Sequence, residues 1–200
     1  QVPIFYTPKE YSRFLELIDY YRFADLHLSF SHYSRLSPEE KELSRKNKKD
    51  KLVEILSYCL MTNHFHLFLR QLKENGIVKM IGNLQNCYVR YFNLRNERIG
   101  PLFQSVFKAI RIETDEQALH VSRYIHLNPT TSYLVETENL LSYQWSSLPE
   151  YLKEKPTGFV ETDFILKLAG GQEKYKNFVF DQIEYQRQLH KIRHLSLETI

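Results

Sequence analysis

Residues 52–70 read LVEILSYCLMTNHFHLFLR, and this stretch determines the predicted fold. Its pattern predicts two strands, 52–60 and 64–70, which are joined by a tight turn of three residues. Residues two apart on a strand point to the same side of a sheet. We therefore expect the imidazoles of His64 and His66 to lie together on one face of this hairpin.

Amphipathic periodicity predicts a helix on each side of the hairpin, over 9–23 before it and over 77–94 after it. Between the first helix and the hairpin, Ser37 directly precedes Pro38. This pair indicates the start of another helix, with Ser37 as the N-cap and Pro38 at the first helical position.

Downstream of these elements, alternating residues over 105–112 predict a further strand, and a helix is expected over 116–127. We expect Pro129 to end that helix, because the residue before a proline is pushed out of the helical region. Two more helices are expected over 159–168 and 173–189. The order helix, hairpin, helix, strand, helix is typical of an α+β domain that has an antiparallel sheet with helices on one face.

Composition excludes several function classes. The 200 residues are 42% hydrophobic, which supports one domain with a packed core, and the 27 basic and 24 acidic residues leave a net charge of only +3. That balance excludes a strongly polycationic binder. The six glycines form neither a dinucleotide-binding motif nor a P-loop.

The two cysteines, Cys59 and Cys87, are too few for a disulfide framework or a four-cysteine zinc site. A reduced, cytoplasmic compartment is the expectation. No apolar run approaches the length of a membrane span. Because the chain begins at Gln1 rather than Met, we expect its natural start to be missing.

The pair His64 and His66 has the spacing that two ligands of one divalent metal would need, but a surface pair without function shows the same pattern. On the helix over 116–127, Tyr124 and Asn128 are four residues apart and share one flank. Tyr124 could instead be a half-buried packing residue, and Asn128 could be a helix C-cap. Arg123 and His126 are expected to project from the other side of this helix, whose buried stripe comprises Ala118, Val121, Ser122 and Ile125.

Six basic residues fall between Lys41 and Lys51 against two acidic ones. This segment is predicted to be either a solvated surface or a contact to phosphates that is independent of sequence.

Three short motifs occur in a fixed order: MTNHFHL at 61–67, GPLFQ at 100–104 and RYIHLNP at 123–129. Together they resemble the REP-associated tyrosine transposases, which belong to the HUH single-strand nucleases and are related to the small insertion-sequence transposases. The resemblance runs over about residues 1–150. It implies a ferredoxin-like sheet that carries the His-hydrophobic-His motif on a central strand.

The same resemblance implies a nuclease domain over 1–150, which lacks the family's N-terminal strand. Beyond residue 150 the sequence pattern changes, and we interpret the two helices predicted there as a small C-terminal helical appendix over 151–200. It implies that His64 and His66 are metal ligands and that Tyr124 is the nucleophile. Asn128 stands where the insertion-sequence relatives place a glutamine ligand, and it is one methylene shorter. This donor set suits Mn²⁺, or Mg²⁺ with added waters.

The activity implied is that of a metal-dependent single-stranded DNA endonuclease and strand transferase, which acts on hairpin DNA through a 5′-phosphotyrosine link. Lys108, Arg111, Arg90 and Arg123 are candidate DNA contacts, although solvated surface charge would give the same pattern. No membrane partner is expected, and the chain is predicted to be a monomer or a homodimer.

Two other functions remain open at this point. The first is a hairpin-binding module without catalysis on the same fold. The second is an unrelated zinc hydrolase, which would need an acidic third ligand and would not need Tyr124.

Overall fold

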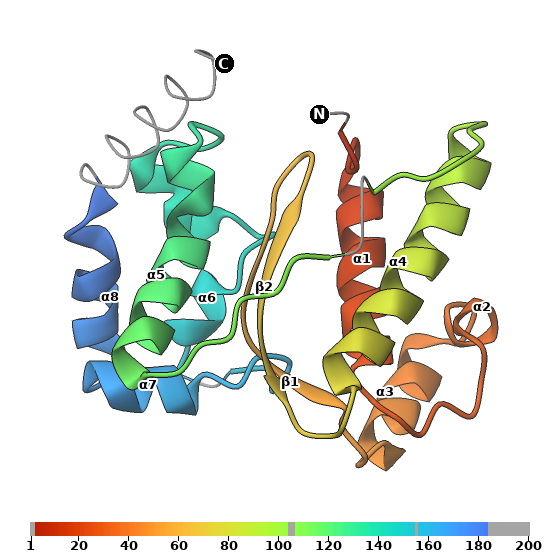
Figure 1. Cartoon of the computed structure of the whole chain (residues 1–200), viewed down its shortest axis with the longest axis horizontal. Helices are drawn as coiled ribbons and strands as arrows, with labels where there is room; N and C mark the ends of the chain where they lie inside the picture. The colour runs from red at the N-terminus through yellow and green to blue at the C-terminus, as the bar shows by residue number, and fades with distance from the viewer. Residues whose placement is uncertain (1–2, 104–106, 155, 184–200) are drawn as a thin grey trace. The chain divides into compact units, whose positions relative to one another are not determined.

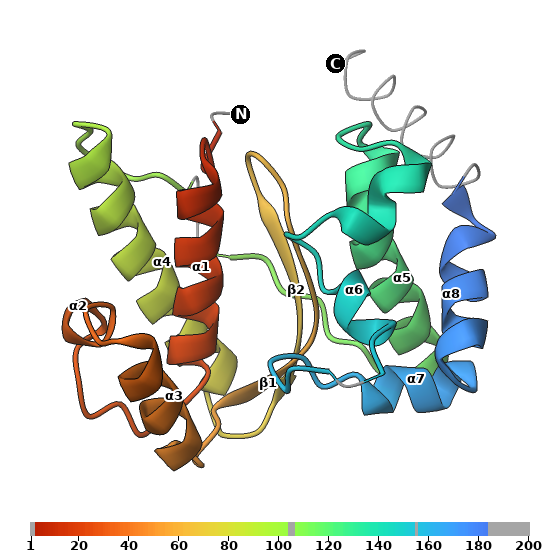
Figure 2. The same cartoon turned by 180° about the vertical axis from the view of Figure 1, so that it is seen from behind.

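The computed structural model describes residues 3–103, 107–154 and 156–183. Its elements are shown in Figures 1 and 2. In chain order they are α1 (Pro8–Tyr21), α2 (Phe30–Tyr33), α3 (Pro38–Asn47), β1 (Val53–Leu60), β2 (Phe65–Gln71), α4 (Gly76–Arg95), α5 (Asp115–Thr131), η1 (Thr137–Ser142), α6 (Leu148–Tyr151), α7 (Asp163–Ala169) and α8 (Gln172–Phe180). The chain divides into two compact units, of which the first comprises Gln1–Glu54 and Leu69–Ala109 and the second comprises Ile55–Phe68 and Ile110–Ile200.

The predicted hairpin is confirmed, because β1 and β2 form a two-stranded antiparallel sheet. The turn between the strands is closed by the Met61 amide, which donates to the His64 carbonyl at 2.9 Å. At the open end, Arg70 donates to Glu54 across the strands at 2.7 Å. β1 is buried at every position except Glu54, so it forms the core side of the hairpin.

In the first unit, α1 and α4 lie side by side and cover each other's apolar faces (Figures 1 and 2). The ring of Phe14 in α1 meets Tyr88 in α4 edge to face, with 4.9 Å between the ring centroids. The hydroxyl of Tyr88 donates to the Ile4 carbonyl at 2.5 Å. Buried aromatic contacts of this kind hold the two helices together.

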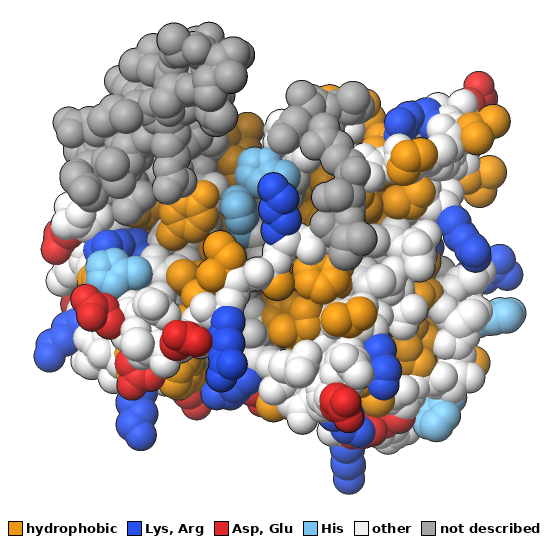
Figure 3. Space-filling model, viewed as in Figure 1, with side chains coloured by type: hydrophobic (Ala, Val, Ile, Leu, Met, Phe, Trp, Pro, Cys, Tyr) orange, Lys and Arg blue, Asp and Glu red, His pale blue; other side chains and the backbone are white. Residues whose placement is uncertain are grey.

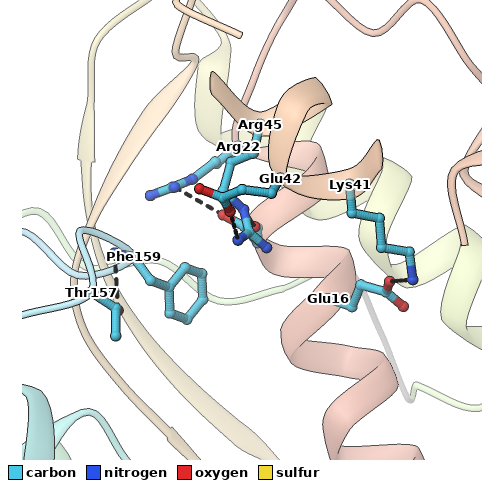
Figure 4. A network of polar contacts seen from close by, with 8 residues as sticks. Glu16, Arg22, Lys41, Glu42, Arg45, Thr157 and Phe159 are labelled. Atoms are coloured by element: carbon cyan, nitrogen blue, oxygen red, sulfur yellow. Dashed lines mark hydrogen bonds and ion pairs between the residues drawn. The ribbon is translucent and has the colours of Figure 1, made fainter. Parts of the chain in front are cut away.

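α3 begins as predicted, with Ser37 as N-cap, a complete capping box and Pro38 in the first turn. Charged pairs then join it to α1, as Figure 4 shows. Lys41 Nζ lies 2.7 Å from Glu16, and Arg45 Nε lies 2.8 Å from Asp19. These pairs supply contacts that the polar α3, which has no buried residue, does not obtain from apolar packing.

The strand predicted over 105–112 is wrong for residues 107–112, which form no regular structure; residues 105 and 106 lie outside the described part. The alternating residues of this segment do not form a buried face. Lys108, Ala109 and Arg111 are all exposed, and Ile110 is 88% exposed. Among the described residues the sheet therefore has two strands, and the ferredoxin-like sheet is not complete.

The prediction that Pro129 ends its helix is also wrong, because α5 continues to Thr131. A proline removes one amide donor from the helix, but here the next turn is still closed. The amide of Ser132 donates to the Asn128 carbonyl at 3.1 Å, and its hydroxyl donates to the same oxygen at 2.7 Å. Ser132 is consequently the C-cap, and Asn128 lies inside the helix.

The two expected C-terminal helices are present as α7 and α8, separated by Gly170 and Gly171, although residues 184–189 of the second prediction lie outside the described residues. Gly170 has φ of +82°, a conformation that glycine adopts without a steric penalty. Both helices pack against α5 within the second unit. In the part of the chain that the structure describes, no helix has the length and apolar character needed to cross a membrane.

Candidate active site

The histidine pair lies where the hairpin turns, within the second unit. His64 is the last residue of the turn and His66 is the second residue of β2. Their rings stand edge to face with 4.9 Å between centroids, which confirms that both imidazoles point to the same side. Two imidazoles at this separation can approach a single small ion.

Asn63 fixes the orientation of the first imidazole. Its Oδ1 lies 2.7 Å from His64 Nδ1, and an amide oxygen can only accept, so this ring nitrogen carries the proton. The other nitrogen of His64, Nε2, therefore keeps its lone pair. A hydrogen bond to the far ring nitrogen is the usual way in which a protein orients a metal-binding histidine.

His66 is the more deeply buried of the two. Burial and, to a smaller extent, the neighbouring His64 together lower the pKa of His66 to about 4, against a hydrogen bond with the Asn128 side chain that acts in the opposite direction. Burial also lowers the pKa of His64. Both rings are therefore neutral near pH 7, which is the form that donates a lone pair to a metal.

His66 Nε2 is buried and has no hydrogen-bond partner among the described residues. A buried polar atom left without a partner costs free energy, so such atoms in folded proteins call for an explanation. An electrophilic ligand that the chain itself does not supply would satisfy this nitrogen.

α5 brings Tyr124 and Asn128 to the histidines. The Tyr124 ring stands edge to face against His66 with 5.6 Å between centroids, and Tyr124 is 41% exposed. Asn128 Nδ2 donates to the Tyr124 carbonyl at 2.8 Å, which leaves its Oδ1 as the amide atom available to His66 or to an ion. Asn128 is therefore not the C-cap that was considered as an alternative.

The donor set that results is two imidazole nitrogens and one amide oxygen. The described residues contain no group of three or more His, Cys, Asp or Glu side chains that could hold a metal. The set is instead a mixed nitrogen and oxygen site, which fits Mn²⁺, or Mg²⁺ with water as the remaining ligands.

The opposite face of α5 carries a second polar cluster, which the sequence analysis missed. His126 is fully buried, and its two ring nitrogens lie 2.7 Å from Tyr175 of α8 and 2.7 Å from Ser147. We expected His126 to project from the helix flank with Arg123. His126 lies instead in the core, and its partners are 21 and 49 residues away in the chain, so local spacing gives no signal for them.

Arg123, a predicted DNA contact, is 7% exposed and packs on α8. Its guanidinium lies 4.0 Å from the centroid of the Phe178 ring and donates to the Phe178 carbonyl at 3.3 Å. It also donates to His120 Nδ1 at 2.8 Å. In this position Arg123 holds α5 to α8, and its contact to DNA stays a prediction.

The other predicted DNA contacts, Lys108, Arg111 and Arg90, are exposed. On the face drawn in Figure 3, some basic side chains of the described residues stand next to acidic ones and others stand apart from them. In the basic segment 41–51, Lys41 and Arg45 are engaged with acidic residues of α1, and Lys48 Nζ lies 4.0 Å from the centroid of the Tyr20 ring. These three cations already have structural partners within the first unit.

Two neighbouring imidazoles on a hairpin, with a helix-borne tyrosine against them, define a class of site: a pair of potential metal ligands beside a potential nucleophile. Residues 31–128 match the model of the family described as "Transposase IS200 like". Over this stretch the chain belongs to the IS200-like transposase family, which includes the REP-associated tyrosine transposases that its motifs resemble. Neither the curated proteins nor the solved structures contain a significant match to the chain.

Proposed function

We propose that the chain is a metal-dependent single-stranded DNA endonuclease and strand transferase that acts on hairpin DNA. Tyr124 is the proposed nucleophile, and His64, His66 and Asn128 are the proposed metal ligands. Family membership supports the general activity. The observation that carries the assignment of residues is the contact between the Tyr124 ring and His66, whose buried Nε2 has no partner among the described residues.

The residues present fit the divalent ion that the family resemblance implies. His64 Nε2 is held with its lone pair available by Asn63, and His66 Nε2 lacks a partner in the described chain. Asn128 has its amide nitrogen engaged by the Tyr124 carbonyl, so its oxygen is the atom that would meet His66 or the ion. A bound divalent ion would polarise the phosphate of the substrate and stabilise the negative charge that develops on it.

In the proposed reaction the Tyr124 hydroxyl oxygen attacks the phosphorus of one phosphodiester. A phosphorus–oxygen bond to Tyr124 forms while the bond to the 3′ oxygen breaks, which leaves a 5′-phosphotyrosine and a free 3′-hydroxyl. The phenolic proton passes to solvent, which reaches the partly exposed Tyr124, and the departing oxygen takes up a proton. A second 3′-hydroxyl can reverse the step, which is strand transfer.

The proposal includes a nuclease domain over 1–150 on a ferredoxin-like sheet, with an appendix over 151–200. Support for a wider sheet comes from β1. The Ser147 amide donates to the Tyr58 carbonyl at 3.0 Å, and the Leu60 amide donates to the Trp145 carbonyl at 2.9 Å. β1 therefore pairs with a second backbone segment in addition to β2, as an inner strand of a larger sheet would.

Cleavage of end-labelled single-stranded hairpins, with and without Mn²⁺, tests this function against its alternatives. The proposal predicts Mn²⁺-dependent cleavage that leaves protein attached to the 5′ end of the product. Binding without cleavage under any metal would identify a non-catalytic hairpin-binding module. Cleavage without a covalent adduct would indicate a hydrolase.

A further inference from the structure

A continuous chain of buried hydrogen bonds runs behind the helix that carries Tyr124. Ser57 Oγ on β1 lies 3.0 Å from Ser122 Oγ on α5, and Ser122 Oγ lies 2.5 Å from the hydroxyl of Tyr175 on α8. Tyr175 OH lies 2.7 Å from His126 Nδ1, and His126 Nε2 lies 2.7 Å from Ser147 Oγ. All five residues are buried.

One assignment of protons satisfies every link of this chain. The Ser147 hydroxyl donates to the Tyr58 carbonyl at 3.2 Å, so His126 must donate to Ser147 through its Nε2 proton. His126 Nδ1 then accepts from Tyr175, Tyr175 accepts from Ser122, and Ser122 accepts from Ser57. A fully satisfied polar network in a low-dielectric core fixes one arrangement of the elements it joins, because any other arrangement leaves a buried group without a partner.

The position of Tyr124 on α5 makes this network relevant to the site. Tyr124 lies two residues from both Ser122 and His126, so at about 100° per residue it points to the opposite side of the helix. Rotation of α5 that moved Tyr124 away from His66 would break the links at Ser122 and His126. The network therefore holds the helix at the rotation that keeps the Tyr124 ring against His66.

α8 also contacts α5 through a second set of residues outside this network. The Phe178 ring and carbonyl engage Arg123, and His120 meets the Phe178 ring edge to face at 5.5 Å between centroids. α8 lies beyond residue 128, where the match to the transposase family ends. The family match alone would make this helix dispensable for catalysis.

We infer that α8 is part of the cleavage machinery and that Tyr175 is a positioning residue, which sets the nucleophile helix through Ser122 and His126. The inference rests on the proposed function of Tyr124. The hydrogen bonds of Tyr175 go to Ser122 and His126 of α5, so its effect on the position of Tyr124 would pass through that helix.

The test is Tyr175→Phe in the full chain, which removes one hydroxyl and keeps the ring. We expect the single-turnover rate constant for formation of the covalent adduct to fall by about 10- to 100-fold, since small misplacement of a reacting group has effects of that size. The dissociation constant for the uncleaved hairpin should stay unchanged. A purely structural role would instead lower the amplitude of the reaction, because fewer molecules would be folded, and would leave the rate constant of the folded fraction as it was.

Tyr88→Phe is the matched control, because Tyr88 is also fully buried and its hydroxyl also donates a hydrogen bond, but in the first unit. It should react with the wild-type rate constant. If Tyr175→Phe does not fold, Ser122→Ala interrupts the same network from α5 itself and should give the same loss of rate.

Hydrogen exchange supplies a readout that does not depend on cleavage. Amides of α5 should exchange faster in Tyr175→Phe, while those of α4 keep their wild-type protection. The inference is overturned if the rate constant of Tyr175→Phe equals that of the wild type, or if α5 remains as protected as in the wild type. Absence of any adduct in the wild-type protein would contradict the proposed function instead, and exchange in α5 would still decide the role of Tyr175.

Discussion

His66 and His126 are two histidines of the same unit, of which His66 is partly buried and His126 is fully buried, and they differ in the partners of their ring nitrogens. Burial lowers the pKa of both, to about 4 for His66 and to about 3 for His126. His126 has a hydrogen-bond partner at each ring nitrogen. His66 has a buried Nε2 that no group of the described chain satisfies.

In the proposed function, this difference separates a structural histidine from a metal-binding one. A pKa lowered by burial is shared by both residues, so this property alone does not identify a site. The unpartnered Nε2 of His66 supports the proposed site, because a bound ion would supply the partner that the described chain does not. The helix α5 contributes residues near both histidines. Tyr124 faces His66, and Ser122 lies on the same side of the helix as His126.

The largest expected effect is that of His66→Ala. Loss of this ligand should reduce hairpin cleavage by about 10³-fold or more, because a metal contributes several kcal/mol to stabilisation of the transition state. Hairpin binding, measured by fluorescence anisotropy, should largely survive, since phosphate contacts supply most of the affinity. Cleavage by His66→Ala at the wild-type rate would remove His66 from the site.

His126→Ala should act on stability instead. It leaves Tyr175 and Ser147 without a buried partner and opens a cavity, so we expect the free energy of unfolding to fall by about 3 kcal/mol. Urea denaturation in metal-free buffer measures the change. A loss below about 1 kcal/mol would show that the network behind α5 contributes little.

Acid should destabilise the protein through His126. The unfolded chain binds a proton at this residue below about pH 6.5, whereas folded His126 does not bind one until about pH 3. Stability is therefore complete above pH 6.5 and falls on acidification, by about 1.4 kcal/mol per pH unit from this group. The titratable groups that face the ring are the hydroxyls of Tyr151 and Tyr175, which are neutral in this range.

The comparison for this pH effect is His126→Gln, which cannot titrate. Urea denaturation at pH 7.5 and pH 5.5 should show a smaller loss of stability on acidification for His126→Gln than for the wild type. Equal losses in the two proteins would mean that His126 accepts a proton in the folded state.

The smallest effect is expected for Asn63→Ala, which removes the group that orients His64. Mn²⁺ affinity, measured by electron paramagnetic resonance of the free ion, should fall by about tenfold, the lower end of what such indirect ligand contacts contribute. Thr62→Ala is a matched control at the adjacent, exposed turn position. Unchanged affinity in Asn63→Ala would show that His64 needs no such support.

The sequence predicted the elements whose signal is local. The hairpin, α1, α4 and the N-cap of α3 were predicted within a few residues, because apolar periodicity and the Ser37–Pro38 pair specify them directly. The prediction of a strand over 107–112 was wrong, because an alternation of apolar and polar residues alone provides neither a neighbouring strand to pair with nor a buried face.

The candidate site was predicted only in part, for the same reason. His64 and His66 share the predicted strand over 64–70, and Tyr124 and Asn128 share a helix, so the sequence spacing within each pair was enough to predict that its members lie together. The roles of Asn63 and of the network through Tyr175 depend on which atoms meet in the folded chain, and Tyr175 is 49 residues from His126. Arg123 was predicted to be a DNA contact that projects from its helix, but it packs on Phe178 of α8, which is 55 residues away in the chain.

The central claim, that Tyr124 beside the histidine pair is the nucleophile, is tested most directly by mapping the covalent adduct. The protein is incubated with a labelled single-stranded hairpin and Mn²⁺, denatured and digested, and the nucleotide-bearing peptide is sequenced by mass spectrometry. We predict modification at Tyr124 alone in the wild type, no adduct in Tyr124→Phe, and normal adducts in Tyr91→Phe and Tyr133→Phe. An adduct that persists in Tyr124→Phe, or one that maps to another residue, would contradict the account.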